Sequence, residues 1–197
     1  MITQADLVID TGGTRAETSL QVITAWVQRQ LPLPAPLIRR GTPDDADGIR
    51  IVLDSVVGED GQTVLERRRT VMPKRALLRH LPPRSWLTVA QVGNAVAGFQ
   101  VIAPYAHPAR AVDHVATLES YVLAALRGQD LDQAMSRATF EAARALGFRK
   151  LVIHVRADDP GAQRFYERLG FRPCGRLMEQ ALVDGRYVDE LLYELFL

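Results

Sequence analysis

The sequence predicts an α/β domain, and three observations carry that prediction. Residues 118–171 read in succession as strand, loop, helix, strand and helix. Residues 85–92 and 95–104 read as two strands of a hairpin that is joined by a Gly-Asn turn pair. Residues 175–196 read as two closing strands around an Asp-Gly-Arg turn. Parallel strands joined by a helix, with strand pairs before and after them, indicate a sheet covered by helices.

The central strand–helix–strand unit has the clearest pattern. A short strand, Leu118–Leu123, leads into the loop Arg127–Asp132, and the helical pattern that follows stops at Gly147. The next strand, Leu151–Val155, is rich in branched aliphatic residues, and an Asp-Pro-Gly-Ala run at residue 159 opens a second helix. A helix that begins after a strand presents unpaired N–H groups and a partial positive charge. The loop is therefore a predicted binding place for an anionic ligand.

Length and composition narrow the class of protein. A chain of 197 residues, 47% of them hydrophobic, suits one domain with an extension. A net charge of +1 gives no electrostatic case for nucleic-acid binding, and the four histidines show no metal-ligand spacing. No apolar run approaches the roughly 20 residues that span a bilayer, and the first residues do not resemble a signal peptide. We expect a cytoplasmic protein without a disulfide, in which Cys174 is a buried or half-buried hydrophobe.

Residues 1–36 form a predicted N-terminal extension. Residues 7–9 suit a short strand, and Thr14 and Glu17 have the spacing of a capping box. The helix behind them ends in a proline-rich connector. Its apolar face can pack on the main domain, form a homodimer contact or cover a cleft, and we expect it to contain Leu20, Ile23, Trp26, Val27 and Leu31.

Residues 37–197 form the predicted main domain. Its first strand is Leu37–Arg40, and Thr42 followed by Pro and two Asp residues is a good helix start. The pattern turns polar and loop-like from Gly58 to Arg69, and another helix is expected over 71–81. Gly98 inside its strand suggests a bulge.

Two stretches resemble the signature motifs of a known family. The run DPGAQRFYERLGF at residues 159–171 resembles the Asn-x-x-Ala-x-x-Phe-Tyr-x-x-x-Gly-Phe motif of the GNAT superfamily of acyl-CoA-dependent N-acetyltransferases. The run RGQDLD at 127–132 resembles the family's Arg/Gln-x-x-Gly-x-Gly/Ala pyrophosphate loop in a degenerate form, because Asp130 and Asp132 replace its glycines. The resemblance implies a mixed, mostly antiparallel sheet that is flanked by helices and splayed between the signature strand and the next strand. It also implies acetyl transfer from acetyl-CoA, bound in that split, to a primary amine of a small molecule.

The same resemblance implies roles for individual residues. Tyr166 would protonate the departing thiolate, and Glu119 on the signature strand is a candidate general base. Glu66–Arg69 and Met72 would lie on the acceptor side. The implied acetyl-CoA contacts are the backbone of Val122 and Leu123, the loop residues Arg127, Gly128, Gln129, Asp130, Leu131 and Asp132, and Asp159, Ala162 and Tyr166 of the second motif.

Each of these residues also has a plain structural interpretation. Tyr166 suits a core aromatic position, and Glu119 suits a solvated or ion-paired strand position. Strand alternation puts Glu119 on the same face as Tyr121. His114 is a second candidate base, whereas His154 suits a core or surface position better than a catalytic one.

The two loop aspartates leave two hypotheses open. If Asp130 or Asp132 caps the helix, the carboxylate takes the place of a phosphate and cofactor binding is weak or lost. If both turn outward, toward Arg127 or Arg137, the N–H groups still bind pyrophosphate. The first hypothesis favours a non-catalytic protein that acts through protein contacts, and the second favours an enzyme. An acyl-CoA sensor without turnover is a third hypothesis.

Overall fold

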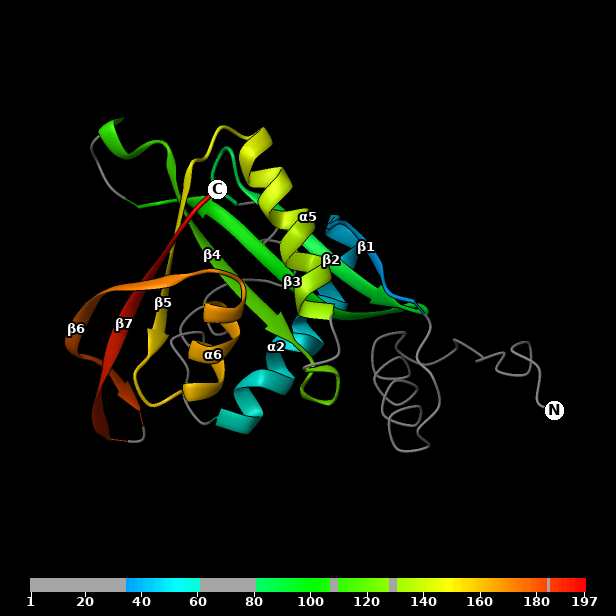
Figure 1. The fold of residues 1–197 in the computed structure, drawn as a ribbon. Coiled ribbons are helices and arrows are strands. Elements are labelled where there is room, and N and C mark those ends of the chain that lie inside the picture. The colour runs from blue at the N-terminus through cyan, green and yellow to red at the C-terminus, as the bar shows by residue number, and fades with distance from the viewer. Residues whose placement is uncertain (1–34, 61–80, 107–109, 128–130, 184) are drawn as a thin grey trace.

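The computed structural model describes residues 35–60, 81–106, 110–127, 131–183 and 185–197 (Figure 1). Several predictions from the sequence fall on other residues. These predictions, which lie outside the described residues, are the helix of the N-terminal extension, the acceptor-side residues 66–69 and Met72, the helix expected from residue 71, and Gly128, Gln129 and Asp130 of the loop.

Seven strands of the described chain form one sheet in the order β1-β2-β3-β4-β5-β7-β6 (Figure 1). Neighbouring strands are antiparallel except β4 and β5, which are parallel. This is the mixed, mostly antiparallel sheet that the sequence predicts. The strands are β1 (Leu37–Arg40), β2 (Trp86–Val92), β3 (Ala95–Pro104), β4 (Val115–Val122), β5 (Lys150–Arg156), β6 (Arg172–Val183) and β7 (Arg186–Phe196).

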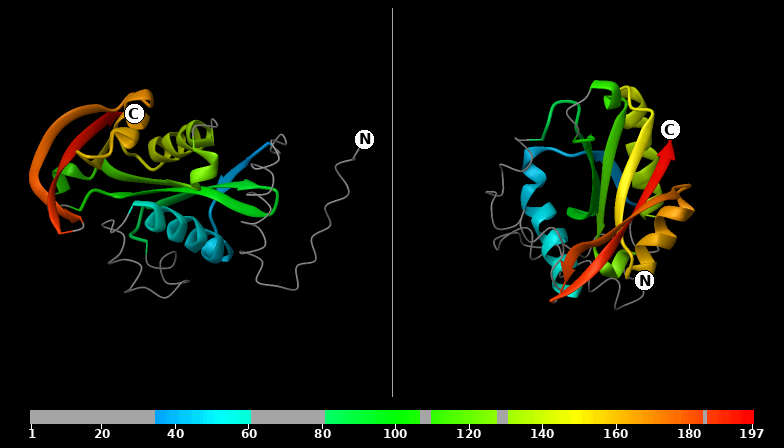
Figure 2. Two further views of the ribbon diagram at one scale, coloured as in Figure 1. Left: turned by 90° about the horizontal axis from the view of Figure 1, so that it is seen from below. Right: turned by 90° about the vertical axis from the view of Figure 1, so that its left-hand side faces the viewer.

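In the described residues, three α-helices cover the two faces of the sheet. Helix α2 lies on one face, and α5 and α6 lie on the other (Figure 2). None of the described helices is long and apolar enough to span a membrane. The helices are α2 (Ala46–Asp60), α5 (Leu131–Ala145) and α6 (Pro160–Arg168), with short 3-10 turns η1 (Pro43–Asp45), η2 (Arg110–Val112) and η3 (Ala124–Leu126).

The start of α2 follows the predicted capping pattern. The backbone N–H of Thr42 donates to Asp45 Oδ2 at 2.7 Å, and Arg39 donates to both carboxylate oxygens of Asp45 at 2.6 and 2.8 Å. The pair ties the helix start to strand β1. The predicted end of this helix is wrong, because α2 continues to Asp60. A single glycine, here Gly58, costs only about 1 kcal/mol of helix propensity and does not by itself stop a helix.

Strand β3 carries the predicted bulge. Ala90 of β2 pairs with Gly98, and the next β2 residue, Gln91, pairs with Val96, so that β3 has one extra residue. A Cβ atom at Gly98 would lie 2.9 Å from the carbonyl oxygen of Tyr121. Glycine is therefore required here because β4 approaches β3 closely.

Strand β6 is an edge strand with two irregularities, and the first corrects the prediction for Cys174. Pro173 pairs with Tyr193 and Gly175 pairs with Leu192, so that Cys174 has no residue opposite it. Its side chain is exposed rather than buried. Partial desolvation and the Glu194 carboxylate raise the pKa of the thiol, which disfavours the reactive thiolate.

Within the part of the chain that the structure describes, the buried apolar residues form two clusters. The first joins α2, β1 to β4 and the beginning of α5, and its centre includes Val52, Phe99 and Met135. The second joins β4, β5, β7, α6 and the end of α5, and its centre includes Leu151 and Phe171. Helix α5 contributes to both clusters, whereas α2 packs in the first and α6 in the second, so that helices cover the sheet on both sides of the junction between β4 and β5.

Candidate active site

The parallel strands β4 and β5 separate after a short paired segment. Their register runs from Val115 opposite Lys150 to Thr117 opposite Val152, and β4 then continues for five residues without pairing with β5 (Figure 1). Over this part β4 stays fully paired with β3 on its other side. The structure therefore contains the predicted split, which opens where Thr117 and Val152 end the pairing.

Backbone alternation decides which β4 groups face the split. The carbonyl of His114 accepts from Arg149 N–H on the β5 side, whereas the N–H of Leu123 donates to Ala97 of β3 at 3.0 Å. Even-numbered residues of β4 thus direct both backbone groups toward β5, and odd-numbered residues direct them toward β3. Beyond the pairing, Ser120 and Val122 present backbone N–H and C=O groups to the split. Of the two predicted backbone contacts, Val122 faces the split and the Leu123 amide is bound within the sheet.

The beginning of α5 lies beyond the carboxyl end of β4. Helix α5 starts at Leu131 and carries Asp132 in its first turn. Arg127, the last described residue before the loop, is exposed and follows the turn η3. The helix start offers N–H groups to an anion, and the Asp132 carboxylate is the acidic group placed there.

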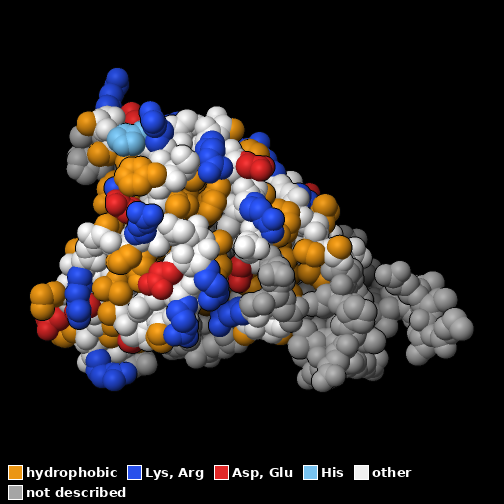
Figure 3. Space-filling model, viewed as in Figure 1, with side chains coloured by type: hydrophobic (Ala, Val, Ile, Leu, Met, Phe, Trp, Pro, Cys, Tyr) orange, Lys and Arg blue, Asp and Glu red, His pale blue; other side chains and the backbone are white. Residues whose placement is uncertain are grey.

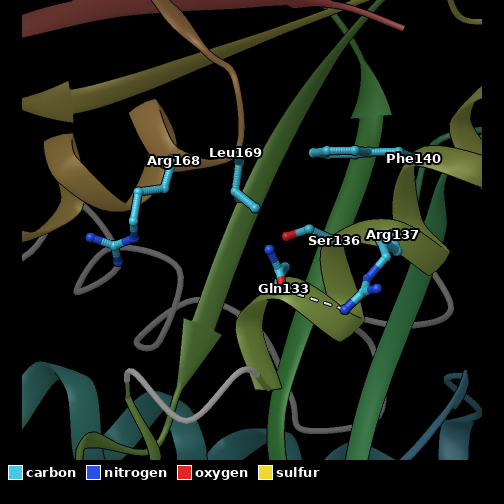
Figure 4. Close-up of a pocket in the computed structure, with 6 residues that line it drawn as sticks. All are labelled: Gln133, Ser136, Arg137, Phe140, Arg168 and Leu169. Carbon is cyan, nitrogen blue, oxygen red and sulfur yellow. Dashed lines mark hydrogen bonds between the residues drawn. The ribbon is translucent and has the colours of Figure 1, made fainter.

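A cavity of about 220 Å³ lies between α5 and α6 (Figure 4). Arg137 of α5 and Arg168 of α6 contribute positive charge from its two sides, and Arg137 is held by Gln133 Oε1 at 3.4 Å. Figure 3 shows this face of the molecule, with Lys and Arg side chains over both helices. The complete lining is Gln133, Ser136, Arg137, Phe140, Arg168 and Leu169.

A buried polar cluster lies beneath this cavity. The Gln100 amide of β3 donates to Ser120 Oγ of β4 at 3.1 Å and to Ser136 Oγ of α5 at 2.9 Å. Gln100 is fully buried, and its Oε1 has no hydrogen-bond partner among the described residues. In Figure 4 Ser136 points from α5 toward Leu169. The cluster fixes α5 over the open part of β4, with the Ser136 hydroxyl in the cavity wall.

Tyr166 of α6 is buried next to the split. Its ring contacts Phe165 and Phe171, with centroids 4.8 and 5.5 Å away. The hydroxyl makes no hydrogen bond to the described part of the chain. Burial raises the pKa of Tyr166 well above its ordinary value, and the carboxylates of Glu119, Asp132 and Asp159 raise it further. Tyr166 therefore stays protonated at neutral pH.

Asp159 and Ala162, which the sequence predicts to contact acetyl-CoA, are hydrogen-bonded to each other. Asp159 is the N-cap of α6, and its Oδ1 accepts from Ala162 N–H at 2.9 Å. Pro160 follows as the first helical residue. The aspartate keeps the capping function that either Asp or Asn performs at this position.

The opposite face of the split carries Glu119. The Tyr121 hydroxyl donates to Glu119 Oε2 at 3.1 Å, so that both side chains lie on one face, as alternation predicts. Phe99 stacks on Tyr121 with ring centroids 4.9 Å apart, and its neighbour Gln100 points to α5. Glu119 and Tyr121 therefore lie on the α2 side of the sheet.

The two histidines of the sequence analysis lie at different ends of this region. His114 precedes β4 at the paired end, where its carbonyl accepts from Arg149 and Lys150. His154 of β5 lies beyond the pairing, with its side chain 39% exposed, and its Nδ1 is 3.0 Å from Glu190 Oε2. The described residues contain no cluster of metal-ligand type.

Sequence reasoning missed several of these residues. Glu190 of β7 meets His154, and Gln100 of β3 meets Ser136, only because of how distant strands and helices pair. Arg168 lies inside the matched second motif, at one of its unspecified positions, so that the motif gave no signal for it. The common cause is that each contact joins residues more than 30 positions apart or at positions that the motif leaves free.

Comparisons with known proteins identify a family. The profile of the acetyltransferase (GNAT) family matches residues 57–171, which is more than half of the chain. No curated protein matches the sequence.

Solved structures share the fold at low sequence identity. A GNAT-family acetyltransferase from Streptococcus pneumoniae is 22% identical, with a TM-score of 0.73 over 83% of this chain and 100% of that one. A ribosomal-protein-alanine N-acetyltransferase from Brucella melitensis is 22% identical, with a TM-score of 0.69 over 82% and 99%. The putative acetyltransferase yncA from Salmonella typhimurium, solved with its cofactor acetyl-CoA, is 16% identical, with a TM-score of 0.67 over 83% and 94%.

Proposed function

Because this chain belongs to the acetyltransferase (GNAT) family, we propose that it transfers an acetyl group from acetyl-CoA to a primary amine of a small molecule. The observation that carries the proposal is the open split between β4 and β5, with Tyr166 on one side and Glu119 on the other. A tyrosine that keeps its proton and a carboxylate that attracts an ammonium group are the two chemical functions that amine acetylation needs.

The residues of the α5–α6 face fit acetyl-CoA. Arg137 and Arg168 line the cavity between these helices and suit phosphate groups, and the start of α5 offers N–H groups to an anion. The open backbone groups of Ser120 and Val122 suit the amides of an extended arm. When bound, acetyl-CoA supplies an acyl group that is activated as a thioester.

The chain's own groups then act at defined points. The N–H groups of Ser120 and Val122 point into the split, where negative charge develops on the carbonyl oxygen during acyl transfer. The Tyr166 hydroxyl would donate a hydrogen bond to the sulfur of the leaving thiolate. Because its pKa is raised above that of a thiol, Tyr166 stabilises the thiolate by hydrogen bonding, and the final proton comes from solvent.

Glu119 serves the amine. Its carboxylate lies on the face of the sheet opposite to α5 and α6, fixed by the Tyr121 hydroxyl. A carboxylate in that place attracts an ammonium group, and Glu119 stays a candidate for the general base. Cofactor and acceptor would therefore approach the split from opposite faces.

One observation favours a second candidate function. Asp132 places a carboxylate in the first turn of α5, where the pyrophosphate of acetyl-CoA would bind. If this charge prevents binding, the protein is a non-catalytic member of the family that acts through protein contacts. A homodimer, a cytoplasmic location and a domain boundary at residues 36–37 also stay predictions.

The testing experiment is a thiol-release assay with acetyl-CoA and a panel of amines that includes polyamines, amino acids, aminoglycosides and peptide N-termini. We expect at least one small amine to be acetylated, with release of CoA and with the mass increase of one acetyl group in place of a hydrogen, as measured by mass spectrometry. Glu119→Gln, which removes the charge and keeps the shape, should lower kcat/KM for that amine. No binding of acetyl-CoA and no transfer to any amine would favour the non-catalytic function, whereas binding without transfer would favour the acyl-CoA sensor.

A further inference from the structure

The strand register brings a second acid–base pair to the acceptor side of the split. Thr117 and Val152 are the last paired residues of β4 and β5, and both side chains lie on the α2 side of the sheet. Two residues further along each strand, Glu119 and His154 are therefore the first side chains beyond the pairing on that same face. They lie on opposite walls of the opening.

His154 is oriented by a carboxylate from a third strand. Its Nδ1 lies 3.0 Å from Glu190 Oε2, and the Glu190 side chain is only 12% exposed. An ionised carboxylate only accepts hydrogen bonds, so that the proton of the neutral imidazole lies on Nδ1. Nε2 then carries the lone pair, on a ring that is 39% exposed. This is the arrangement of a base held in one tautomer.

We propose that His154, positioned by Glu190, accepts the proton from the acceptor ammonium, while the Glu119 carboxylate holds that ammonium in place. The inference rests on the proposed function. It places the group that binds the ammonium on one wall of the split and the group that accepts its proton on the other. A neutral imidazole exchanges protons near neutral pH, whereas a carboxylate hydrogen-bonded by Tyr121 is a good anchor for a cation.

Charged groups around Glu119 and His154 have ion-pair partners of their own. Arg156, the next β5 residue on this face, is bound to Asp158 at 2.9 Å. Lys150 and Glu194 form an ion pair at the paired end of the strands. In the described part of the chain, the charged groups on the α2-side face of β4, β5 and β7 are Glu119, Lys150, Arg156, Arg186, Glu190 and Glu194, with His154 among them.

The acceptor ammonium loses two protons in the proposed reaction. His154 Nε2 takes one proton from R–NH₃⁺, which leaves R–NH₂ and an imidazolium. The nitrogen lone pair forms the bond to the thioester carbon, the C=O pair moves to oxygen, and its return breaks the C–S bond. The nitrogen loses a second proton as the amide forms. One proton ends on sulfur and one is released to solvent, which restores the neutral imidazole.

The first test needs neither acetyl-CoA nor an amine. Nitrogen-15 NMR of the histidine rings in the full-length protein, at a pH where the imidazole is neutral, reports which nitrogen carries the proton. His154→Gln assigns the signals. We expect the Nδ1–H form in the native protein and in Glu190→Gln, which keeps an acceptor, and a tautomer mixture in Glu190→Leu, which has none. An Nε2–H form in the native protein would overturn the inference whatever the activity.

The second test is the pH profile of kcat/KM for the best amine of the panel. His154→Gln should lower kcat/KM by about a hundredfold, the lower range for a general base, and should remove the acid limb of the profile. Imidazole in the buffer should partly restore the activity of His154→Ala, since the site is exposed. Glu194→Gln, on the same face of β7 at the paired end, is the matched control and should keep the native profile.

The outcomes separate the two proposals. An active native enzyme whose His154→Gln variant keeps both the rate and the acid limb contradicts the inference and leaves the proposed function intact. A native protein that acetylates no amine contradicts the proposed function. In that case an Nδ1–H tautomer does not by itself support a catalytic role for His154.

Discussion

The two faces of the split sheet are built differently. On the α5–α6 face, the groups that suit a cofactor come from one continuous stretch, from Arg127 to Leu169. On the α2 face, Glu119, His154 and Glu190 come from three strands that are far apart in the sequence. The groups proposed for the cofactor are therefore encoded in one local stretch, and those proposed for the acceptor depend on strand register.

The two faces also differ in the charge of the residues near the split. Arg137 and Arg168 line the α5–α6 cavity, whereas Glu119 and Glu190 lie on the α2 face. An anionic cofactor and a cationic amine would each meet groups of opposite charge. Tyr166 lies between them, since the Glu119 carboxylate contributes to its raised pKa.

The largest expected effect comes from the residue that lies between the faces. Tyr166→Phe should lower kcat by about a hundredfold, because the hydroxyl acts on the departing sulfur, and should change acetyl-CoA affinity little. Steady-state kinetics and calorimetry measure the two quantities separately. An unchanged kcat would remove Tyr166 from the mechanism. No residue would then be assigned a role between the cofactor face and the acceptor face.

Asp45 lies far from the split, so that its substitution should change the stability of the fold and not the chemistry of the site. Burial alone would raise the pKa of Asp45, but hydrogen bonds from Arg39 and Thr42 hold it below its ordinary value. A lowered folded-state pKa means that this stabilisation is complete above about pH 4, the ordinary carboxyl value, and is lost as the pH falls below it. Asp45→Asn should therefore lower the free energy of unfolding at pH 7 by about 2 kcal/mol.

The measurement for Asp45 is urea unfolding at pH 7 and at pH 3, with Asp54→Asn as a control. Asp54 forms an exposed i,i+4 pair with Arg50 at 2.8 Å and should contribute far less. The native protein and Asp45→Asn should converge in stability at low pH. A difference that stays equal at both pH values would exclude the charge of Asp45 as its cause.

The cavity arginines should affect only the cofactor side. The double variant Arg137→Gln/Arg168→Gln should raise the Kd of acetyl-CoA by about fivefold, as expected for two exposed charge contacts, with little change in the KM of the amine. The effect should shrink as salt increases. A larger effect on the amine than on acetyl-CoA would show that the two faces are assigned the wrong way round.

The smallest expected effect concerns the helix start. Asp132→Asn should lower the Kd of acetyl-CoA by about threefold, because it removes a like charge where an anion would bind and keeps the side-chain shape. Asp158→Asn, an exposed acid outside the helix start, is the control. A weaker affinity in Asp132→Asn would mean that the carboxylate helps to form the site.

The sequence predicted the family, the strand–helix–strand unit and the split. These follow from local signals, such as the Gly-Asn hairpin turn, the helix stop at Gly147 with its φ of +81°, and the Asp159 cap. Of the candidate residues, Glu119, Val122 and Tyr166 lie around the split, and the roles assigned to them stay predictions.

The remaining features depend on contacts that local signals do not encode. The hydrogen bond that engages Leu123 N–H continues the β3–β4 register, and Glu190 meets His154 only through the β5–β7 register. Cys174 is exposed because it lies on the edge strand β6, in which residues 172–176 are all exposed. In each case the pairing of strands, rather than residue type, decides the surroundings.

The most direct test of the central claim is a calorimetric titration of the native protein with acetyl-CoA, beside the Asp130→Gly/Asp132→Gly variant. The proposed function predicts binding in the micromolar range by the native protein and somewhat tighter binding by the variant. Binding by the variant alone, or by neither protein, would contradict the claim that the α5–α6 face is a working cofactor site.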